Sequence, residues 1–540
     1  MRTFYTDAVV YPGKGMPAAD SFLVEDGRFV FVGASEDAAD LIASCDSVVD
    51  LHGDFVCAGF NDSHMHLLSY GQTLDSAMLA EHTDSLAGML DYLRAYIKEK
   101  QPAPGEWVFG RGWNQDFFSD VHRLPSRVDL DKVSPDQPIV ISRACGHCLV
   151  VNSAALRLTG INPDTPCPEG GRIGMEDGVP DGRFYDNAME LIFERTPLPD
   201  KQKVRSMILS ACRSLNACGI TSAQTDDYCV WRKLPWETVN EAFRELEESG
   251  ELTVRVYEQA NFTSPETFAD FMEKGSKTGA GTDMFRIGPL KMLGDGSLGA
   301  RTAYLSVPYA DKPDTRGIPV FGREVLEEMI SLAVKNDMQV AVHCIGDACL
   351  DEVLSAYEKA FAAYRPKDHR CGIVHCQITR PEQLIKIEDL GLHVYAQTIF
   401  LDYDIRMVRD RVGDALAAAS YSWKALSDMG VTVSNGTDCP VESPDVMRCI
   451  QCAVTRRTLD GIGPYLPEQA FTVAEAIDGY TSVGAYASFD EEKKGMIRAG
   501  MLADFTVLDA DPFTVSPERL KDIRVLRTYL GGRQVYPISK

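Results

Sequence analysis

The chain lacks three features that would each assign it to a broad class of proteins. It has no excess of positive charge, because 54 Lys and Arg against 79 Asp and Glu give a formal net charge of −25. That balance argues against nucleic acid or an anionic membrane as a partner. It has no apolar run long enough to span a bilayer. Residues 1–7 lack a basic flank followed by an apolar core, so no signal peptide is predicted and we expect a cytoplasmic protein.

The chain also lacks the cysteine spacing of a small disulfide-rich scaffold. Its 15 cysteines are scattered along 540 residues. The two C-x-x-C pairs, Cys145/Cys148 and Cys449/Cys452, lie too far apart in sequence for a zinc ribbon. A redox pair would accompany a thioredoxin-like βαβ unit, which the sequence does not show. Reduced and mostly buried thiols are the simplest interpretation.

What the chain does have is an ordinary globular composition, 45% hydrophobic and 25% charged. Its length exceeds that of one compact core. Short strand-like runs separated by Pro-Gly and Asp-Gly turns fill residues 1–57, and residues 496–540 show the same pattern. Because chain termini often lie close together, we expect the two ends to form one small β-sandwich domain.

Between the ends, residues 58–495 alternate between expected strands and expected helices. The expected strands are 55–61, 219–225, 252–257, 285–293, 339–343, 371–375, 392–397 and 431–436. The helix expected before the second strand covers 201–217, and the helix expected before the last strand covers 414–429. Eight such strands, each followed by a helix, predict an α/β fold of the TIM (β/α)8 barrel type. The interval 69–200 is too long for one connection, so we expect an insertion after the first barrel strand that overhangs the barrel mouth.

The expected strands end in side chains of the kinds that bind metal ions, which are His64, His66, Lys291, His343, His375 and Asp438. Side chains at the carboxyl ends of barrel strands converge on one mouth. His64 and His66 point the same way, because side chains alternate along a strand. Imidazole and carboxylate are usual ligands of zinc-like divalent cations. The sequence therefore predicts a metal site at the barrel mouth.

Other interpretations of these residues stay open at this point. Two cations a few ångströms apart need a bridging anion, which Lys291 could supply if its amine had taken up carbon dioxide to form a carbamate. A bare ammonium group would be repelled by two cations. The alternative is an ordinary lysine paired with Asp295 at the barrel rim. His343 and His375 could be hydrogen-bonded core histidines, and Asp438 a turn residue.

Several segments resemble the amidohydrolase superfamily, and more narrowly its amidohydrolase-3 (YtcJ-like) branch. They are His64-Met-His66, Lys291–Ala303, Val342–Asp347, Val374–Cys376 and Gly436–Val441, supported by Arg143–Leu156 and Gly495–Asp504. The resemblance runs nearly end to end. It implies a distorted TIM barrel that carries a β-sandwich built from both termini, which agrees with the count of strands above.

The resemblance also implies a metal centre and a reaction. It implies that His64 and His66 hold one Zn²⁺ ion, that His343 and His375 hold a second, and that a carboxylated Lys291 bridges the two. Asp438 would bind metal and carry the proton. The implied reaction is hydrolysis of a carbon–nitrogen bond in a small-molecule, non-peptide amide, N-acyl or N-formyl compound. A metal-bound hydroxide would attack the carbonyl, with Asp438 as general base and then general acid.

Five further residues are candidates for binding the substrate. Trp113, Arg143 and His147 belong to the expected insertion, and Asp295 and Arg301 follow the fourth strand. Plain packing is the alternative for Trp113, and a structural turn for His147. Relatives with this fold are often dimers, but no part of the sequence indicates an interface, so a homodimer stays open.

Two rival functions remain. A deaminase of the same superfamily would use one metal, but such enzymes usually place a glutamate soon after the fifth-strand histidine, and His343 is followed by Cys-Ile-Gly-Asp. A non-catalytic metal-binding scaffold could share the fold, although it would not need Asp438. The seventh strand departs from the pattern of the family, because Gln397 is followed by Thr398 where Pro is expected. That difference concerns the pocket more than the metal site.

Overall fold

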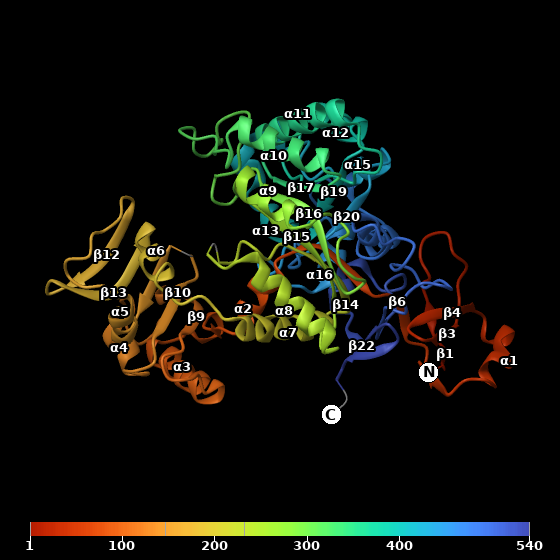
Figure 1. Cartoon of the computed structure of the whole chain (residues 1–540), viewed down its shortest axis with the longest axis horizontal. Coiled ribbons are helices and arrows are strands. Elements are labelled where there is room, and N and C mark those ends of the chain that lie inside the picture. Colours follow the sequence, from red (N-terminus) through yellow and green to blue (C-terminus); the bar gives the residue numbers. More distant parts are fainter. Residues whose placement is uncertain (1, 146, 232, 539–540) are drawn as a thin grey trace. The chain divides into compact units, whose positions relative to one another are not determined.

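The computed structural model describes residues 2–145, 147–231 and 233–538. These residues form two compact units (Figure 1). The first, which we call the barrel unit, comprises residues 1–69 and 211–540, and the second, the insertion, comprises residues 70–210. The sequence placed the insertion at about 69–200. No helix among the described residues is both long enough and apolar enough to cross a membrane.

Eight parallel strands form the central sheet of the barrel unit. In sheet order they are β20 (Val433–Asn435), β19 (His393–Ala396), β18 (Gly372–His375), β17 (Val340–Cys344), β16 (Phe285–Leu293), β15 (Arg255–Asn261), β14 (Ile220–Thr225) and β7 (Phe60–Met65). Hydrogen bonds join the two ends of the sheet, since Asp438 N donates to His64 O at 2.8 Å and His66 N to Cys439 O at 2.7 Å. The expected TIM-type barrel is confirmed.

Helices follow the barrel strands and lie outside them (Figure 1). They are α8 (Trp236–Glu248), α9 (Pro265–Glu273), α10 (Arg323–Lys335), α11 (Asp347–Tyr364), α12 (Pro381–Asp389), α13 (Leu401–Asp404), α14 (Val408–Ala417), α15 (Trp423–Asp428), α16 (Val446–Thr455), α17 (Val473–Gly479) and α18 (Ser482–Ala487). Strands such as β14, β15 and β18 are buried along their whole length. Such burial is expected of a parallel sheet that is covered on both faces.

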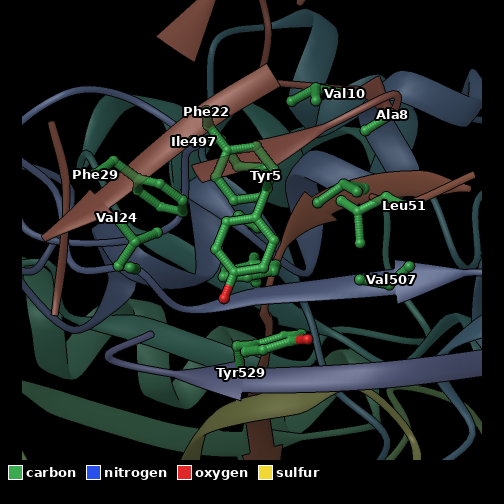
Figure 2. Close-up of a cluster of buried hydrophobic side chains, with 14 of the residues drawn as sticks. Tyr5, Ala8, Val10, Phe22, Val24, Phe29, Leu51, Ile497, Val507 and Tyr529 are labelled. Atoms are coloured by element: carbon green, nitrogen blue, oxygen red, sulfur yellow. The ribbon is translucent and has the colours of Figure 1, made fainter. Parts of the chain in front are cut away.

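Two further sheets of the barrel unit form the predicted sandwich. One has the order β4 (Arg28–Gly33), β3 (Ser21–Glu25), β1 (Arg2–Thr6) and β5 (Ser47–Asp50), and the other β2 (Val9–Val10), β6 (Phe55–Ala58), β21 (Phe505–Leu508), β22 (Val525–Leu530) and β23 (Arg533–Tyr536). Figure 2 shows their shared core, in which Tyr5 and Phe22 from one end of the chain meet Ile497 and Tyr529 from the other. The Tyr5 and Phe22 rings stack with centroids 4.8 Å apart.

The first barrel strand differs from the one expected at 55–61. Strand β6 belongs to the sandwich, and the barrel begins with β7. The break lies at Gly59, where an added Cβ would come within 2.3 Å of Thr221 Oγ1. Only glycine allows this close approach to β14. As a result His64 lies within β7, and His66 directly follows its last residue.

The insertion has a sheet of its own. The sheet has the order β12 (Gly171–Glu176), β13 (Val179–Asp186), β11 (Cys148–Val151), β10 (Ile139–Arg143), β9 (Val108–Trp113) and β8 (Ala77–Met78), with helices α3 (Leu86–Lys100), α4 (Arg127–Asp131), α5 (Ser153–Thr159) and α6 (Glu190–Phe193). Helices α2 (Leu67–Leu74) and α7 (Lys201–Ala217) begin and end it. They touch at Gly71, where an added Cβ would lie 2.3 Å from Met207 O. The chain therefore enters and leaves the insertion at one place.

Candidate metal centre

Three of the expected metal ligands meet where β7 and β20 close the barrel. Nε2 of His64 lies 3.4 Å, and Nε2 of His66 3.1 Å, from Oδ1 of Asp438. The ligand atoms of all three residues lie within 4.8 Å of one another. Oδ1 of Asp438 is buried and accepts no hydrogen bond from the described part of the chain. A buried carboxylate oxygen of this kind is costly unless a cation or donor satisfies it, so the site fits a metal ion.

The other ring nitrogen of each histidine faces an oxygen that can only accept a hydrogen bond. Nδ1 of His64 lies 2.7 Å from Oε1 of Gln259, and Nδ1 of His66 lies 3.1 Å from the carbonyl oxygen of Asp226. Each Nδ1 therefore carries a hydrogen, and this assignment follows from the partners. Nε2 is left to bind a cation. Outer partners of this kind typically fix the tautomer and orientation of metal-binding histidines.

His343 and His375 form a second pair beside the first. Their ring centroids are 4.4 Å apart, and His375 lies 5.7 Å from His64 by the same measure. Burial lowers the pKa of His375 to about 4 and that of His343 well below its ordinary value, so both rings are neutral, as metal ligands must be. Nδ1 of His375 meets Oε1 of Gln397 at 2.7 Å, whereas Nε2 of His343 meets the carbonyl oxygen of Gly296 at 3.1 Å. The nitrogens left for a cation are thus Nε2 of His375 and Nδ1 of His343.

Lys291 is fully buried in β16 and pairs with a residue that the sequence did not single out. Its Nζ lies 3.3 Å from Oδ2 of Asp226, an oxygen that also accepts a hydrogen bond from Nδ2 of Asn261 at 2.9 Å. The pair with Asp295 that the sequence left open is not formed. The carboxylate of Asp295 instead accepts the backbone N–H groups of Tyr304, Ile345 and Gly346. Asp295 thereby ties the segment after β16 to the end of β17.

The remaining candidates for substrate binding are engaged in local contacts. Arg301 forms a two-pronged ion pair with Asp311, with distances of 3.0 and 2.7 Å. Within the insertion, Trp113 is buried. Arg143 donates to Asp116 at 3.0 Å, and His147 lies 3.0 Å from Asp186 Oδ1. Their part in binding a substrate, like that of Asp295, stays a prediction.

Sequence reasoning missed the residues that support the ligands. They are Asp62, Asp226, Gln259, Asn261 and Gln397, all buried. Asp62 accepts hydrogen bonds from the backbone N–H groups of His64 and Thr437 at 3.2 and 3.1 Å, so it fastens both sides of the barrel seam. The sequence does contain a signal for these supporting residues, because they are polar residues that interrupt or directly follow otherwise apolar strands. It was too weak to separate these residues from ordinary strand polar groups.

A parallel eight-stranded barrel with imidazoles and a carboxylate gathered at its strand ends has the architecture of metal-dependent barrel hydrolases. A family model described as "Amidohydrolase family" matches residues 47–536, and the chain belongs to that family. The chain is 31% identical to the putative amidohydrolase YtcJ of Bacillus subtilis, with 96% of each chain covered. It is 27% identical to the N-substituted formamide deformylase of Arthrobacter pascens, over 95% of this chain and 94% of that one.

A solved structure agrees with this family membership. An uncharacterized metal-dependent hydrolase from Pyrococcus furiosus superposes with a TM-score of 0.80 at 28% identity, over 95% of this chain and all of that one. The family implies a divalent metal, and the neutral imidazoles of His343 and His375, together with the Asp438 oxygen described above, suit one. The amidohydrolase membership and the fold expected from the sequence are thus confirmed.

Proposed function

We propose that the chain hydrolyses a carbon–nitrogen bond of a small-molecule, non-peptide amide of the N-acyl or N-formyl type. The single observation that carries the proposal is the buried, unpartnered Oδ1 of Asp438 facing Nε2 of His64 and His66. The similarity to an enzyme named N-substituted formamide deformylase supports the bond type. Two Zn²⁺ ions are the proposed cofactors, since imidazole and carboxylate donors suit zinc.

The residues divide between two ions in this proposal. Nε2 atoms of His64 and His66 would hold one ion, and Nδ1 of His343 with Nε2 of His375 would hold the other. Lys291 is buried and interacts electrostatically with His64, His343 and His375, and once carboxylated it would bridge the ions. Bound divalent ions at such a site lower the pKa of a water molecule and polarise a carbonyl group.

Asp438 carries the proton in this mechanism. Its Oδ1 faces the two histidines and accepts no hydrogen bond from the described part of the chain, so it can accept a proton from the attacking water. The same carboxyl group then returns the proton to the departing nitrogen, which leaves as a neutral amine. Gln259 and Gln397 hold His64 and His375 in orientation while the charge changes. The ring of Phe400 stacks on His375 with centroids 5.6 Å apart and provides an apolar wall beside the reacting bond.

The test is a substrate screen with protein that has been loaded with Zn²⁺. N-formyl and N-acyl amides, cyclic amides, esters and aminated heterocycles are offered in parallel, with the Asp438→Asn variant as the matched control. We expect the unaltered protein to release amine and carboxylate from at least one N-formyl or N-acyl amide, and Asp438→Asn to do so far more slowly. Release of ammonia from a heterocycle, with every amide left intact, would instead favour the deaminase.

A further inference from the structure

A second group of metal-binding side chains borders the first. The ligand atoms of His66, Asp226 and Cys229 lie within 4.8 Å of one another. Asp226 and Cys229 belong to the segment that follows β14, and His66 follows the neighbouring strand β7. Asp226 is buried, His66 is partly exposed and Cys229 is exposed. A dissolved cation can therefore reach the sulfur and the imidazole from the solvent.

The hydrogen bonds of Asp226 leave one of its oxygens directed at the thiol. Oδ2 receives the amide of Asn261 at 2.9 Å and the amine of Lys291 at 3.3 Å. Within the described part of the chain, Oδ1 receives one hydrogen bond, from Sγ of Cys229 at 3.3 Å. Oδ2 of Asp226 is thus held by Asn261 and Lys291, whereas Oδ1 faces the S–H hydrogen of Cys229. That hydrogen is the one in the group that a cation readily replaces.

The charges of the group suit a cation once that hydrogen has left. In the metal-free chain, where Lys291 is not carboxylated, a thiolate and a carboxylate carry two negative charges against the one positive charge of its ammonium group. Sulfur, imidazole and carboxylate together are ligands of zinc-type ions, and the thiolate selects soft metals over Mg²⁺ or Ca²⁺. Within the described part of the chain, the three residues form two ion pairs with other groups, Asp226 with Lys291 and His66 with Asp438.

We propose that His66, Asp226 and Cys229 form a site for a thiophilic divalent cation, such as Zn²⁺ or Cd²⁺, at the barrel mouth. On binding, the S–H bond of Cys229 breaks, a sulfur–metal bond forms and the proton passes to water. His66 also belongs to the group with His64 and Asp438, so a cation at Cys229 competes with an ion at Asp438 for this imidazole. An excess of a thiophilic cation consequently opposes loading of the proposed catalytic centre.

Cadmium titration of the metal-free, full-length protein tests the site, because a cadmium–thiolate bond absorbs in the ultraviolet and bonds to imidazole or carboxylate do not. We expect the unaltered chain to gain this absorption, Cys229→Ser to lose it, and Cys145→Ser to keep it. Cys145 is the matched control because it is also exposed but lies in the insertion. Equal absorption in the unaltered chain and in Cys229→Ser would overturn the proposal.

Alkylation of the unaltered protein gives a second reading that needs no variant. With iodoacetamide and peptide mass spectrometry, we expect Zn²⁺ or Cd²⁺ to protect Cys229 while the other exposed cysteines, Cys145 and Cys167, react as before. Equal labelling of Cys229 with and without metal would contradict the site. Neither reading uses a substrate, so failure of the amide screen would leave both results standing.

Discussion

Two glutamine side chains determine how the histidines present their nitrogens. Oε1 of Gln259 and Oε1 of Gln397 each lie 2.7 Å from Nδ1 of a histidine, His64 and His375 respectively. Nε2 of Gln259 also donates to the carbonyl oxygen of Ser63 at 3.1 Å. Nε2 of Gln397 is buried without a partner in the described part of the chain. Gln259 is therefore the more firmly held of the two.

Replacing either glutamine by leucine should weaken metal binding. Loss of such an outer partner typically costs about 10–100-fold in metal affinity, which competition with a chelator would measure. Gln259→Leu also loses a backbone contact, whereas Gln397→Leu removes an unsatisfied buried donor. We therefore expect Gln259→Leu to lower the free energy of unfolding by about 1 kcal/mol more. Unchanged affinity in both variants would remove the glutamines from the metal centre.

Asp438→Asn should separate chemistry from metal binding. The four histidines remain, so most of the metal should remain, while loss of the proton carrier should lower turnover by about 10²–10⁴-fold. Elemental analysis and steady-state kinetics on the same preparation would measure both. Near-normal turnover with a full complement of metal would exclude Asp438 from the proton transfers.

Lys291→Ala tests the bridging carbamate. Without the amine there is nothing to carboxylate, so we expect the variant to hold fewer metal ions per chain than the unaltered protein. Elemental analysis after dialysis against a weak chelator gives the stoichiometry. Two tightly held ions in the variant would rule out Lys291 as the bridge.

At the scale of the element, the sequence predicted regular strands and helices well and their interruptions poorly. Helix α7 and strand β16 lie where their apolar patterns placed them. The expected helix 414–429 is instead split into α14 and α15, and Tyr421, between them, has a positive φ of 55°. No local sequence pattern predicts a positive φ at Tyr421. Its hydroxyl group donates a hydrogen bond to Asp404, which lies outside the segment that such a pattern covers.

Partners distant in sequence also explain why the sequence predicted the metal ligands but not the residues that support them. The six expected ligands are recognisable because strand ends are visible in the apolar pattern. Their supporting residues depend on which strands become neighbours, as when Gln259 of β15 reaches His64 of β7. Neighbouring strands are set by the closed barrel, which no single segment encodes.

The carboxylate of Asp295 joins the segment after β16 to the end of β17, and removing this carboxylate tests its contribution to stability. Asp295→Ala leaves the buried backbone N–H groups of Tyr304, Ile345 and Gly346 without their acceptor. Each such loss costs about 1–3 kcal/mol. We expect a lower unfolding free energy and faster hydrogen exchange at these amides than in Asp460→Asn, an exposed control. Unchanged exchange at Ile345 and Gly346 would show that Asp295 is not needed to stabilise this junction.

At the scale of the whole molecule, a buried ion pair connects the barrel to the sandwich. Nε and Nη2 of Arg255 in β15 lie 2.6 and 3.0 Å from the two carboxylate oxygens of Asp504, which directly precedes β21. Both side chains are at most 9% exposed. Such two-pronged pairs are strong, but they leave an uncompensated charge when one partner is lost.

Arg255→Leu should consequently destabilise the chain by about 3–5 kcal/mol. Denaturant titration followed by fluorescence would measure the loss. The double change Arg255→Leu with Asp504→Leu should recover part of it, because no buried charge is left unpaired. If the double variant proved less stable than the single one, the cost would lie in lost packing and not in the stranded carboxylate.

The close approach of α2 and α7 at Gly71 has a consequence for how this chain can change over generations. Because the first and last helices of the insertion lie side by side, the insertion can be lengthened, shortened or exchanged. The distance between its two points of connection to the barrel unit then stays the same. Selection can then change the insertion while the eight-stranded barrel keeps the metal-binding side chains in place.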